Sequence, residues 1–515
     1  MHWKTASACS LALGFGLYFQ SSPDAARAAE TIVKADPRDA AEEGKLFHLP
    51  PGFEAQLVAS EPDIHKPINI AFDDKGRLWV TDTIEYPFPV AEGKPTRDTV
   101  KILEDFGPDG RARKISTFAD NLNIPIGVLP QRGHDGHDSA LVYSIPGIWR
   151  LTDTKNEGKA DQRTLLITGQ AHDDTHGMTG SFIEGFDGMI YAVHGFRNSS
   201  SLTGTDASKI AMTSGHTYRF DSAGGHLQIN TFGQVNPFGM CFDPLGNLYT
   251  SDCETMPILL TLRGAYYSSF GRPHDGLGYG PDMTDHMYGS SAIAGLLDYN
   301  AEQYPAEYQN MMLVGNVVTN KINRAQLVPK GSAFHGDDRP DFLVSDDHWF
   351  RPVCMKLGPD GAIYVADFYN RIIGHYEVDL HHPGRDKQRG RIWRIVYTGK
   401  DAKPAPTKPF DLTKASIPEQ IAYLSDSNFA VRMLAMNYLA DVTGHAAVAP
   451  LQEALGKSPS PFLKAHGMWV LKRLGALSDA MLKSFATDGE RLVRVHAMRV
   501  LSETPNWNAA QRELA

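Results

Sequence analysis

The stretch FDDKGRLWVTD, which begins at Phe72, occurs in variant form four times along the chain. The other copies are FDGMIYAVHG from Phe186, FDPLGNLYTSD from Phe242 and LGPDGAIYVAD from Leu357. Each copy combines an apolar strand end, a tight turn closed by glycine, and an apolar-aromatic strand that ends in a polar group. The turn glycines are 112, 58 and 115 residues apart, at Gly76, Gly188, Gly246 and Gly361. These distances are near multiples of about 57, and such a period indicates repeated copies of one supersecondary unit.

The two long gaps have room for degenerate copies, and candidates are SALVYSIPG from Ser139 and NMMLVGNVV from Asn310. With these included, six strands are centred on Trp79, Val142, Tyr191, Tyr249, Leu313 and Tyr364. A long β-sandwich is the alternative, but a sandwich has no reason to repeat at this period. The sequence therefore predicts an all-β six-bladed β-propeller over residues 45–398. We expect the strand from Gly390 to complete the last blade and the strand from Phe53 to lie near the closure of the ring.

After a Pro- and Lys-rich linker, residues 399–410, the apolar period becomes helical. The segments VRMLAMNYL from Val431, LKAHGMWVL from Leu463 and VRVHAMRVL from Val493 align without gaps, and their apolar residues recur three and four positions apart. Residues 411–515 are predicted to form a HEAT-like helical solenoid, because the spacing leaves room for one partner helix per copy. The repeat explains the matched His466 and His496 better than a metal site does. No polar capping repeat is evident, so we expect the array to be incomplete at its C-terminus.

The first residues are typical of an export signal. Lys4 precedes an apolar stretch over residues 6–19, and Ala-Arg-Ala at residues 26–28 offers a cleavage site. We expect a signal peptide over residues 1–28 and a periplasmic or secreted protein, with an uncleaved membrane anchor as the alternative. The formal net charge of −10 argues against nucleic acid as a partner.

Three cysteines remain beyond this segment, Cys241, Cys253 and Cys354. A bridge between Cys241 and Cys253 is conceivable, but thiols packed as small hydrophobic groups are the preferred interpretation. The chain contains no CxxCH motif, so covalent haem attachment is not encoded in it.

The turn of each repeat lies at one end of the ring. Residues just before a first strand, or just after a second strand, therefore lie at the other end, where loops on a rigid scaffold carry binding groups. The polar candidates before first strands are His176, Asn236, His286 and Arg351, and those after second strands are Arg197, Asn198, Asp252, Glu254 and Arg371. This end thus collects imidazole, guanidinium, carboxylate and amide groups, whereas the opposite end has mostly DxxG turns.

His176 is the candidate catalytic residue. It lies between Asp173-Asp174 and a Gly-rich start of a strand, and the carboxylates would orient its ring and favour its protonated form. A histidine so placed can take a proton from a substrate hydroxyl as hydride departs. A structural or ligand-binding histidine is the alternative. For other candidates the alternative is also a structural role. Asp82 and Asp367 could simply cap loops, and Arg351 and Arg371 could simply bridge blades.

Four long stretches resemble the PVC-type membrane-bound dehydrogenase family, whose propellers carry HEAT repeats and are often fused to a haem-binding CxxCH domain. These stretches begin at Leu49, Gly239, Arg263 and Ser345 and span nearly the whole predicted propeller. More distantly, the propeller resembles the soluble quinoprotein glucose and sorbosone dehydrogenases. A departure from the quinoproteins is Asp252-Cys253-Glu254, where their pattern would have a Gln-Gly-Pro-like stretch.

The second resemblance implies His176 as the base and pyrroloquinoline quinone on the axial face, with calcium assisting. The cofactor-binding candidates are Arg197, Asn198, Asn236, His286, Arg351 and Arg371, and the metal candidates are Asp252 and Glu254. We expect an exported oxidoreductase that oxidises a sugar or related alcohol and passes electrons to a cytochrome. A non-catalytic propeller that binds carbohydrate or protein, with the helical repeats as an interaction arm, is the alternative. A hydrolase or lactonase is a third possibility and would need an axial metal, for which Asn316 could be a further ligand.

Overall fold

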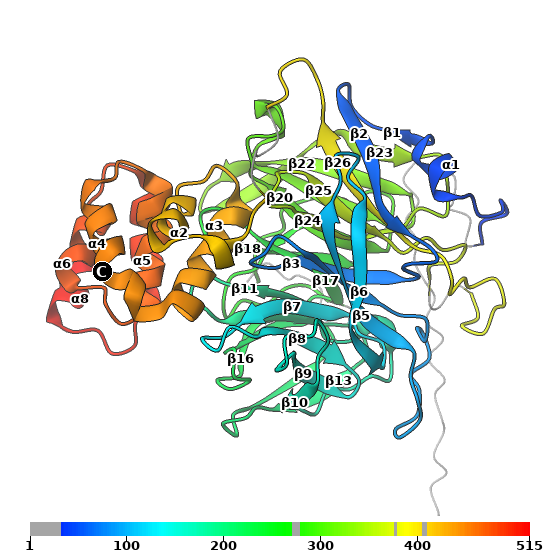
Figure 1. Ribbon diagram of the computed structural model, residues 1–515, viewed down its shortest axis with the longest axis horizontal. Coiled ribbons are helices and arrows are strands. Elements are labelled where there is room, and N and C mark those ends of the chain that lie inside the picture. The colour runs from blue at the N-terminus through cyan, green and yellow to red at the C-terminus, as the bar shows by residue number, and fades with distance from the viewer. Residues whose placement is uncertain (1–31, 270–278, 375–377, 404–408) are drawn as a thin grey trace, which may run out of the picture. The chain divides into compact units, whose positions relative to one another are not determined.

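Six antiparallel sheets follow one another along the chain and form the six blades of a β-propeller, as the sequence predicts. The computed structural model describes residues 32–269, 279–374, 378–403 and 409–515 (Figure 1). The first strands of consecutive blades contact one another in order, and the first strand of the sixth blade contacts that of the first blade. The sheets therefore close into a ring.

The first three blades contain four strands each. Blade 1 consists of β3 (Pro67–Phe72), β4 (Leu78–Asp82), β5 (Asp98–Phe106) and β6 (Ala112–Leu122). Blade 2 consists of β7 (Gly127–Arg132), β8 (Asp138–Ser144), β9 (Gly147–Thr152) and β10 (Gln162–Ile167). Blade 3 consists of β11 (Gly180–Glu184), β12 (Ile190–His194), β15 (His216–Phe220) and β16 (Gln228–Phe232), and the hairpin of β13 (Ser199–Thr203) and β14 (Lys209–Thr213) is inserted after β12.

Among the described residues, the last three blades vary more in strand number. Blade 4 consists of β17 (Asn236–Phe242), β18 (Leu248–Cys253) and β19 (Leu259–Leu260). Blade 5 consists of β20 (Ile293–Tyr299), β21 (Met311–Asn316), β22 (Lys321–Lys330), β23 (Ala333–Ser345) and β1 (Phe47–His48). Blade 6 consists of β24 (Pro352–Leu357), β25 (Ile363–Asp367), β26 (Arg391–Tyr397) and β2 (Phe53–Ser60).

The six predicted strand centres all lie in the second strands of the blades, which are β4, β8, β12, β18, β21 and β25. The two degenerate copies are therefore real blades. In the four regular copies, the turn aspartate accepts a hydrogen bond from the aromatic residue of the second strand. In blade 1, Trp79 Nε1 donates to Asp73 Oδ2 at 2.8 Å, and in blade 4, the Tyr249 hydroxyl donates to Asp243 Oδ2 at 3.2 Å. This contact explains why aspartate, glycine and an aromatic residue recur together.

The turn end of the ring is the end at which these turns lie. The opposite end, where first strands begin and second strands end, is called the polar end. At the polar end, buried aspartates that end second strands accept hydrogen bonds from the start of the first strand. Asp82 Oδ1 accepts from Lys66 N at 2.7 Å, and Asp367 Oδ1 accepts from Arg351 N at 2.8 Å. Both aspartates are therefore loop caps, as the alternative interpretation of the sequence proposed.

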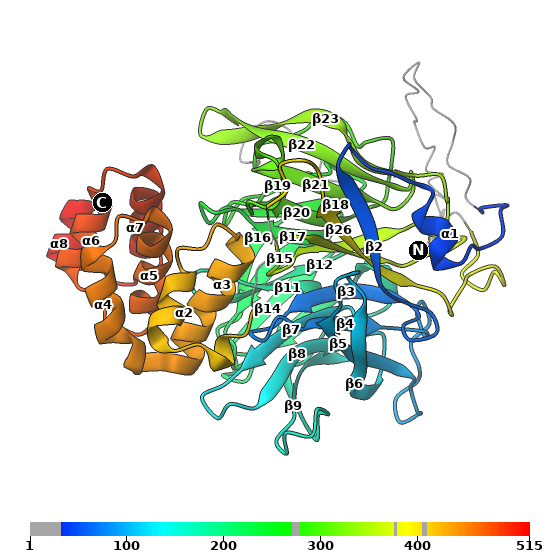
Figure 2. The same ribbon diagram turned by 45° about the horizontal axis from the view of Figure 1, so that its top comes forward.

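Blade 6 closes the ring, because the early strand β2 pairs with the late strand β26, from Phe53 opposite Tyr397 to Ser60 opposite Arg391. The expected roles of both strands are confirmed. The short helix α1 (Ala40–Gly44) lies beside β2 (Figures 1 and 2). It carries Glu43, whose buried carboxylate pairs with the buried Arg391 guanidinium.

Seven helices follow the ring: α2 (Ile417–Tyr423), α3 (Phe429–Tyr438), α4 (Val448–Lys457), α5 (Pro461–Arg473), α6 (Asp479–Ala486), α7 (Arg491–Ser502) and α8 (Ala509–Leu514). The three aligned segments lie in α3, α5 and α7, and α5 contacts both α3 and α7. The helices of the repeat are thus observed, and a HEAT-like solenoid is compatible with them. Among the described residues, no helix is long and apolar enough to cross a membrane.

The helices contact the turn end of the ring. The Phe186 ring, which begins the turn of blade 3, lies 4.7 Å from the His496 ring and 6.2 Å from the Trp469 ring, centroid to centroid. His496 Nε2 lies 2.9 Å from the Pro244 carbonyl oxygen in the turn of blade 4, and Trp469 Nε1 donates to His496 Nδ1 at 2.9 Å. The aligned histidines therefore serve packing and hydrogen bonding. Cys241, Cys253 and Cys354 are free thiols, as the preferred interpretation of the sequence holds.

Acid should weaken the helical region. Both His466 and His496 are buried, and burial lowers their pKa values, to about 4 for His496 from an ordinary 6.5. The unfolded chain therefore takes up protons at a higher pH than the folded chain does. The free energy of unfolding should fall as the pH is lowered from about 6.5 to about 4, by on the order of 3 kcal/mol for His496 alone.

Chemical unfolding of wild type and His466→Met at pH 7 and pH 4.5 tests this expectation. The methionine keeps the buried volume and cannot take up a proton, so the variant should lose less stability on acidification. His445→Gln, which changes an exposed histidine of the same region, is the matched control. Equal losses in wild type and His466→Met would contradict the assignment.

Candidate functional site

Loops from several blades meet at the polar end of the ring. Thr175, between β10 and β11, donates through its hydroxyl to the Pro87 carbonyl oxygen in the β4–β5 connection at 2.7 Å. From the same connection, the Tyr86 ring lies 5.7 Å from the Phe368 ring, which follows β25. Residues before a first strand and after two different second strands therefore lie together, as the ring geometry predicts.

His176 and Asp174 form the central pair of this site. His176 lies in a short 3₁₀ turn, Thr175–Gly177, whose N-cap is Asp174. The Asp174 carboxylate accepts a hydrogen bond from His176 N at 3.2 Å and pairs with His176 Nδ1. Their side chains are 26% and 10% exposed, respectively. An ionised carboxylate only accepts hydrogen bonds, so Nδ1 carries the proton and Nε2 of the neutral ring keeps its lone pair.

Two predicted asparagines hold this pair in place. Asn198 is fully buried, and its Nδ2 donates to the Asp174 carbonyl oxygen at 2.8 Å while its Oδ1 accepts from Asp174 N at 3.2 Å. Asn236 is also buried, and its Nδ2 donates to the His176 carbonyl oxygen at 3.4 Å. The structure thus brings His176, Asn198 and Asn236 together. The asparagines contact the backbone of the loop, so their observed contacts are positioning contacts.

Arg197 lies beside this group on an exposed position, with a backbone φ of 60°. Its neighbour Phe196 donates from its backbone N to Asn236 Oδ1 at 3.1 Å, and the Phe196 ring lies 6.1 Å from the His176 ring, edge to face. Glu254 is likewise exposed, with a φ of 72°.

Tyr86 and Arg385 belong to this region and were not predicted from the sequence. Burial raises the pKa of Tyr86, the Asp174 carboxylate raises it further, and Arg385 acts in the opposite direction. The Tyr86 hydroxyl therefore stays protonated. Arg385 Nη2 donates to the carbonyl oxygens of Gly374 at 2.6 Å and Val378 at 2.7 Å. Both residues lie in long connections that follow second strands. Their polar side chains were the one feature of the sequence that could have identified them as site residues.

Three other predicted residues, Arg351, Arg371 and His286, have their polar contacts with residues outside the His176 group. Arg351 is buried, donates to the Asn370 and Val317 carbonyl oxygens, and has its pKa lowered to about 10 by burial. It therefore bridges the backbone after β25 of blade 6 and after β21 of blade 5. Arg371 forms an ion pair with Asp36 at 3.2 Å and lies over the Trp349 ring.

His286 pairs with Asp338 on β23 at 2.6 Å, and its Nδ1 accepts from Tyr288 N at 3.2 Å. Since β23 lies three strands outward from the first strand of blade 5, this pair lies away from the inner strands. The cofactor-binding roles of Arg351, Arg371 and His286 stay predictions.

Both carboxylate oxygens of Asp252 accept hydrogen bonds from backbone N–H groups. Its Oδ1 accepts from Asn236 N at 2.6 Å and its Oδ2 accepts from Val235 N at 2.9 Å. Thr255 also donates to Oδ2 through its hydroxyl. Burial raises the pKa of Asp252 to about 7. Within the ranges that the structure describes, no three carboxylate, histidine or cysteine side chains gather as a metal site, and the metal-binding roles of Asp252 and Glu254 stay predictions.

An anionic quinone such as pyrroloquinoline quinone would need cationic donors that face a common space. Of the three predicted arginines, Arg351 and Arg371 are engaged between blades or with Asp36, and Arg197 alone adjoins the His176 group. The three predicted arginines therefore do not form a quinone site by themselves, and Arg385, which acts on Tyr86, is a further cation in this region.

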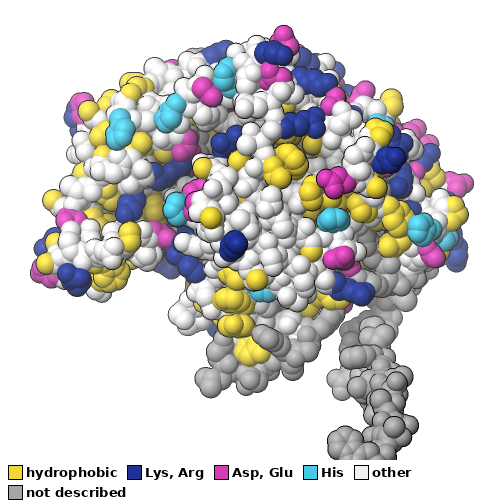
Figure 3. Space-filling view, turned by 90° about the horizontal axis from the view of Figure 1, so that it is seen from below, with side chains coloured by type: hydrophobic (Ala, Val, Ile, Leu, Met, Phe, Trp, Pro, Cys, Tyr) yellow, Lys and Arg dark blue, Asp and Glu magenta, His cyan; other side chains and the backbone are white. Residues whose placement is uncertain are grey.

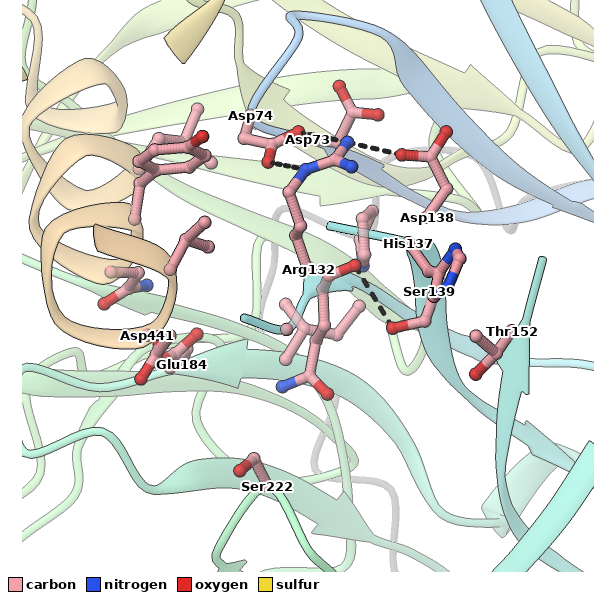
Figure 4. A pocket seen from close by; sticks show the side chains of 18 of the residues that line it. Asp73, Asp74, Arg132, His137, Asp138, Ser139, Thr152, Glu184, Ser222 and Asp441 are labelled. Atoms are coloured by element: carbon pink, nitrogen blue, oxygen red, sulfur yellow. Dashed lines mark hydrogen bonds and ion pairs between the residues drawn. The ribbon is translucent and has the colours of Figure 1, made fainter. Parts of the chain in front are cut away.

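A cavity of about 390 Å³ lies between the turn end and helix α3. Several of its charged side chains are paired, as Figure 4 shows for Arg132 between Asp74 and Asp138. Arg77 also reaches Asp138, at 2.9 Å. Opposite charges are similarly interspersed on the face seen in Figure 3. Because turn residues of blades 1 and 2 and residues Leu434, Asn437 and Tyr438 of α3 line it together, we interpret this cavity as part of the contact between ring and helices.

Residues 39–399 match a family described as a domain of unknown function, DUF7133. A search of the curated proteins found no match. The PQQ-bound aldose sugar dehydrogenase of Streptomyces coelicolor is similar at 14% identity and a TM-score of 0.44, over 68% of this chain and 100% of that one. The soluble aldose sugar dehydrogenase of Escherichia coli, in its apo form, is similar at 14% and 0.41, over 67% and 99%.

The calcium-binding protein regucalcin of Agrobacterium tumefaciens is similar at 14% identity and a TM-score of 0.39, over 69% of this chain and 98% of that one. Likenesses at this level show the fold alone. The function has to be inferred from the residues of this chain.

The Asp174–His176 pair should fix the tautomer of the ring. In Asp174→Asn, the carboxamide can donate to Nδ1, so the proton should move to Nε2. The ¹⁵N chemical shifts of the His176 ring, measured in protein labelled at histidine, would report the exchange. Asp173→Asn changes the exposed neighbouring carboxylate and should leave the shifts unchanged. Identical His176 shifts in wild type and Asp174→Asn would show that the pair does not set the tautomer.

Proposed function

The chain belongs to the DUF7133 family, and we propose that it is an oxidoreductase-like propeller that oxidises a sugar or related alcohol at its polar end. The Asp174–His176 pair carries this proposal. It combines a histidine that is one-quarter exposed with a carboxylate that is nearly buried, and two buried asparagines hold its backbone.

The proposed role of His176 is general base. Nε2 would accept the proton of the substrate hydroxyl, and Asp174 would stabilise the imidazolium that forms, since a carboxylate on Nδ1 favours the charged ring. Tyr86 stays protonated, so it can donate a hydrogen bond to a substrate oxygen. The base and the protonated phenol would thus orient one alcohol group between them.

Oxidation also requires an acceptor of two electrons, and a quinone-type cofactor would supply that capacity when bound. The support for it is the sequence resemblance to the soluble quinoproteins and the adjacency of Arg197 to His176. Calcium is part of the same proposal. It would need ligands in addition to Asp252, both of whose carboxylate oxygens accept backbone hydrogen bonds.

The second candidate is a non-catalytic propeller that binds carbohydrate or protein. The contacts of Arg351 and Arg371 favour it, because the buried Arg351 guanidinium donates to two backbone carbonyl groups and Arg371 is paired with Asp36. A binding module would retain the polar end and its loops without an electron acceptor. The two candidates therefore differ in redox chemistry and share sugar binding.

The proposed setting is outside the cytoplasm. The basic residue Lys4, the apolar residues 6–19 and the Ala-Arg-Ala site support export as a periplasmic or secreted protein, or as one held at the membrane by an uncleaved signal. A cytochrome would accept the electrons, either as a separate protein or as a domain outside the given sequence, which has no CxxCH motif. The helical region would serve as the surface for a protein partner.

Turnover should depend on His176. Purified full-length protein, supplied with pyrroloquinoline quinone and calcium, should reduce a redox dye in the presence of an aldose from a panel of sugars. Loss of a general base costs about 100- to 10,000-fold in rate, so His176→Ala should lose at least 100-fold. His445→Ala changes an exposed histidine of the helical region and serves as the control.

Quinone binding is measured separately by absorbance titration. Absence of both quinone binding and dye reduction in the wild type, with sugar binding retained, would favour the non-catalytic candidate. Equal losses in His176→Ala and His445→Ala would remove the special role of His176.

A further inference from the structure

A large cleft lies on the outer side of the polar end, between blades 1 and 2. Its volume is about 780 Å³, and we call it the blade 2 cleft. Its walls are residues 89–96 of the β4–β5 connection, residues 121–123, residues 144–146, and the side chains of Trp149, Leu151, Arg163 and His172. A volume of this size is in the range of ligand sites rather than of packing gaps.

The loop that forms one wall is held in place. Asn123 Nδ2 donates to the Val90 carbonyl oxygen at 2.8 Å, and its Oδ1 accepts from Val90 N at 3.0 Å. At the base of the loop, Arg97 forms an ion pair with Glu85 at 2.9 Å. Asn123, which lies between β6 of blade 1 and β7 of blade 2, therefore holds this wall from outside the loop, and the ion pair joins the two ends of the loop, which favours a preformed site.

The lining combines apolar faces with hydrogen-bonding groups. Trp149 and the prolines Pro89, Pro95 and Pro146 supply apolar surface. Arg163 and His172 supply polar groups, and the buried Nδ1 of His172 has no hydrogen-bond partner among the described residues. Flat apolar faces beside donors and acceptors suit a pyranose ring, which presents C–H faces and a rim of hydroxyl groups.

The charge of the lining favours a neutral ligand. Its charged residues are Glu92, Lys94 and Arg163, and Arg163 is paired with Asp120 at 3.3 Å. One negative and two positive groups, one of them neutralised, form no strong field of either sign. Polyanions would find too few cations here, and a lipid tail would meet too many polar groups.

The cleft is joined to the catalytic loop. Residues 168–179 connect β10, the outermost strand of blade 2, to β11, the first strand of blade 3. His172 in the cleft and His176 at the polar end both lie on this connection. Four residues span at most about 14 Å, a distance that a chain of a few sugar rings can bridge.

We propose that the blade 2 cleft binds successive units of a neutral oligosaccharide whose terminal unit lies at His176. This inference rests on the proposed function and names its substrate class, an oligosaccharide rather than a free monosaccharide. Trp149 stacks on one ring and Arg163 and His172 hydrogen-bond its hydroxyl groups. Affinity then rises with chain length until the cleft is filled.

Isothermal titration calorimetry with glucose and with glucans of two to six units, in α-1,4 and β-1,4 linkage, tests this proposal. Affinity should rise about tenfold or more between the monomer and the tetramer in one series, since a stacked ring and its hydrogen bonds are worth about 1.4 kcal/mol. Arg163→Ala and Trp149→Ala should remove that rise and leave glucose binding unchanged. Trp149→Phe should keep part of it and checks that the blade still folds.

Lys159→Ala is the matched control. Lys159 pairs with the same Asp120 carboxylate as Arg163 does, at 2.6 Å, but it does not line the cleft. The proposal is overturned if affinity is independent of length in both series, or if Arg163→Ala binds the tetramer as Lys159→Ala does. Length-dependent binding without dye reduction supports the cleft and rejects the oxidation. Dye reduction with length-independent affinity rejects the cleft and keeps the oxidation.

Discussion

Buried carboxylates at the ends of second strands hold the polar end of the ring together. Asp82, Asp252 and Asp367 each accept backbone hydrogen bonds from the start of the first strand of the same blade. A buried backbone N–H left without a partner costs about 1 to 3 kcal/mol, so each carboxylate stabilises the start of its blade. These contacts fix where the loops leave the ring. The site around His176 therefore stands on a rigid base, which a general base needs for its geometry.

The fold could be predicted because each blade repeats a local interaction. The aspartate of the turn, the glycine that closes it and the aromatic residue of the second strand all lie within a few residues, so the sequence alone displays them. Asp243 and Tyr249 are one such set, and their hydrogen bond is 3.2 Å long. Blades 2 and 5 could be predicted from the spacing of the other four copies along the sequence. Their second strands, β8 and β21, keep the apolar pattern that packing requires.

The candidate site could be predicted only in part, because its contacts join residues far apart in the sequence. Strand direction predicts that His176, Asn198 and Asn236 lie at one end of the ring, and the structure brings them together there. Side-chain direction does not follow from strand direction. Arg351 points between blades to backbone carbonyl groups. Tyr86 was missed because its position within a long connection has no counterpart in the repeat.

The pairing of β2 with β26 has a consequence for how the protein is made. The two strands are separated by nearly the whole propeller, with Phe53 opposite Tyr397, so the ring cannot be completed until the last blade has been synthesised. Until then, blade 6 lacks its β2–β26 pairing, so the contact between β24 of blade 6 and β3 of blade 1 is not held in place. Strand edges meanwhile stay open to pairing with other chains. Biogenesis is therefore the stage at which this protein is most exposed to aggregation, and a chaperone that shields strand edges would act before residue 397 emerges.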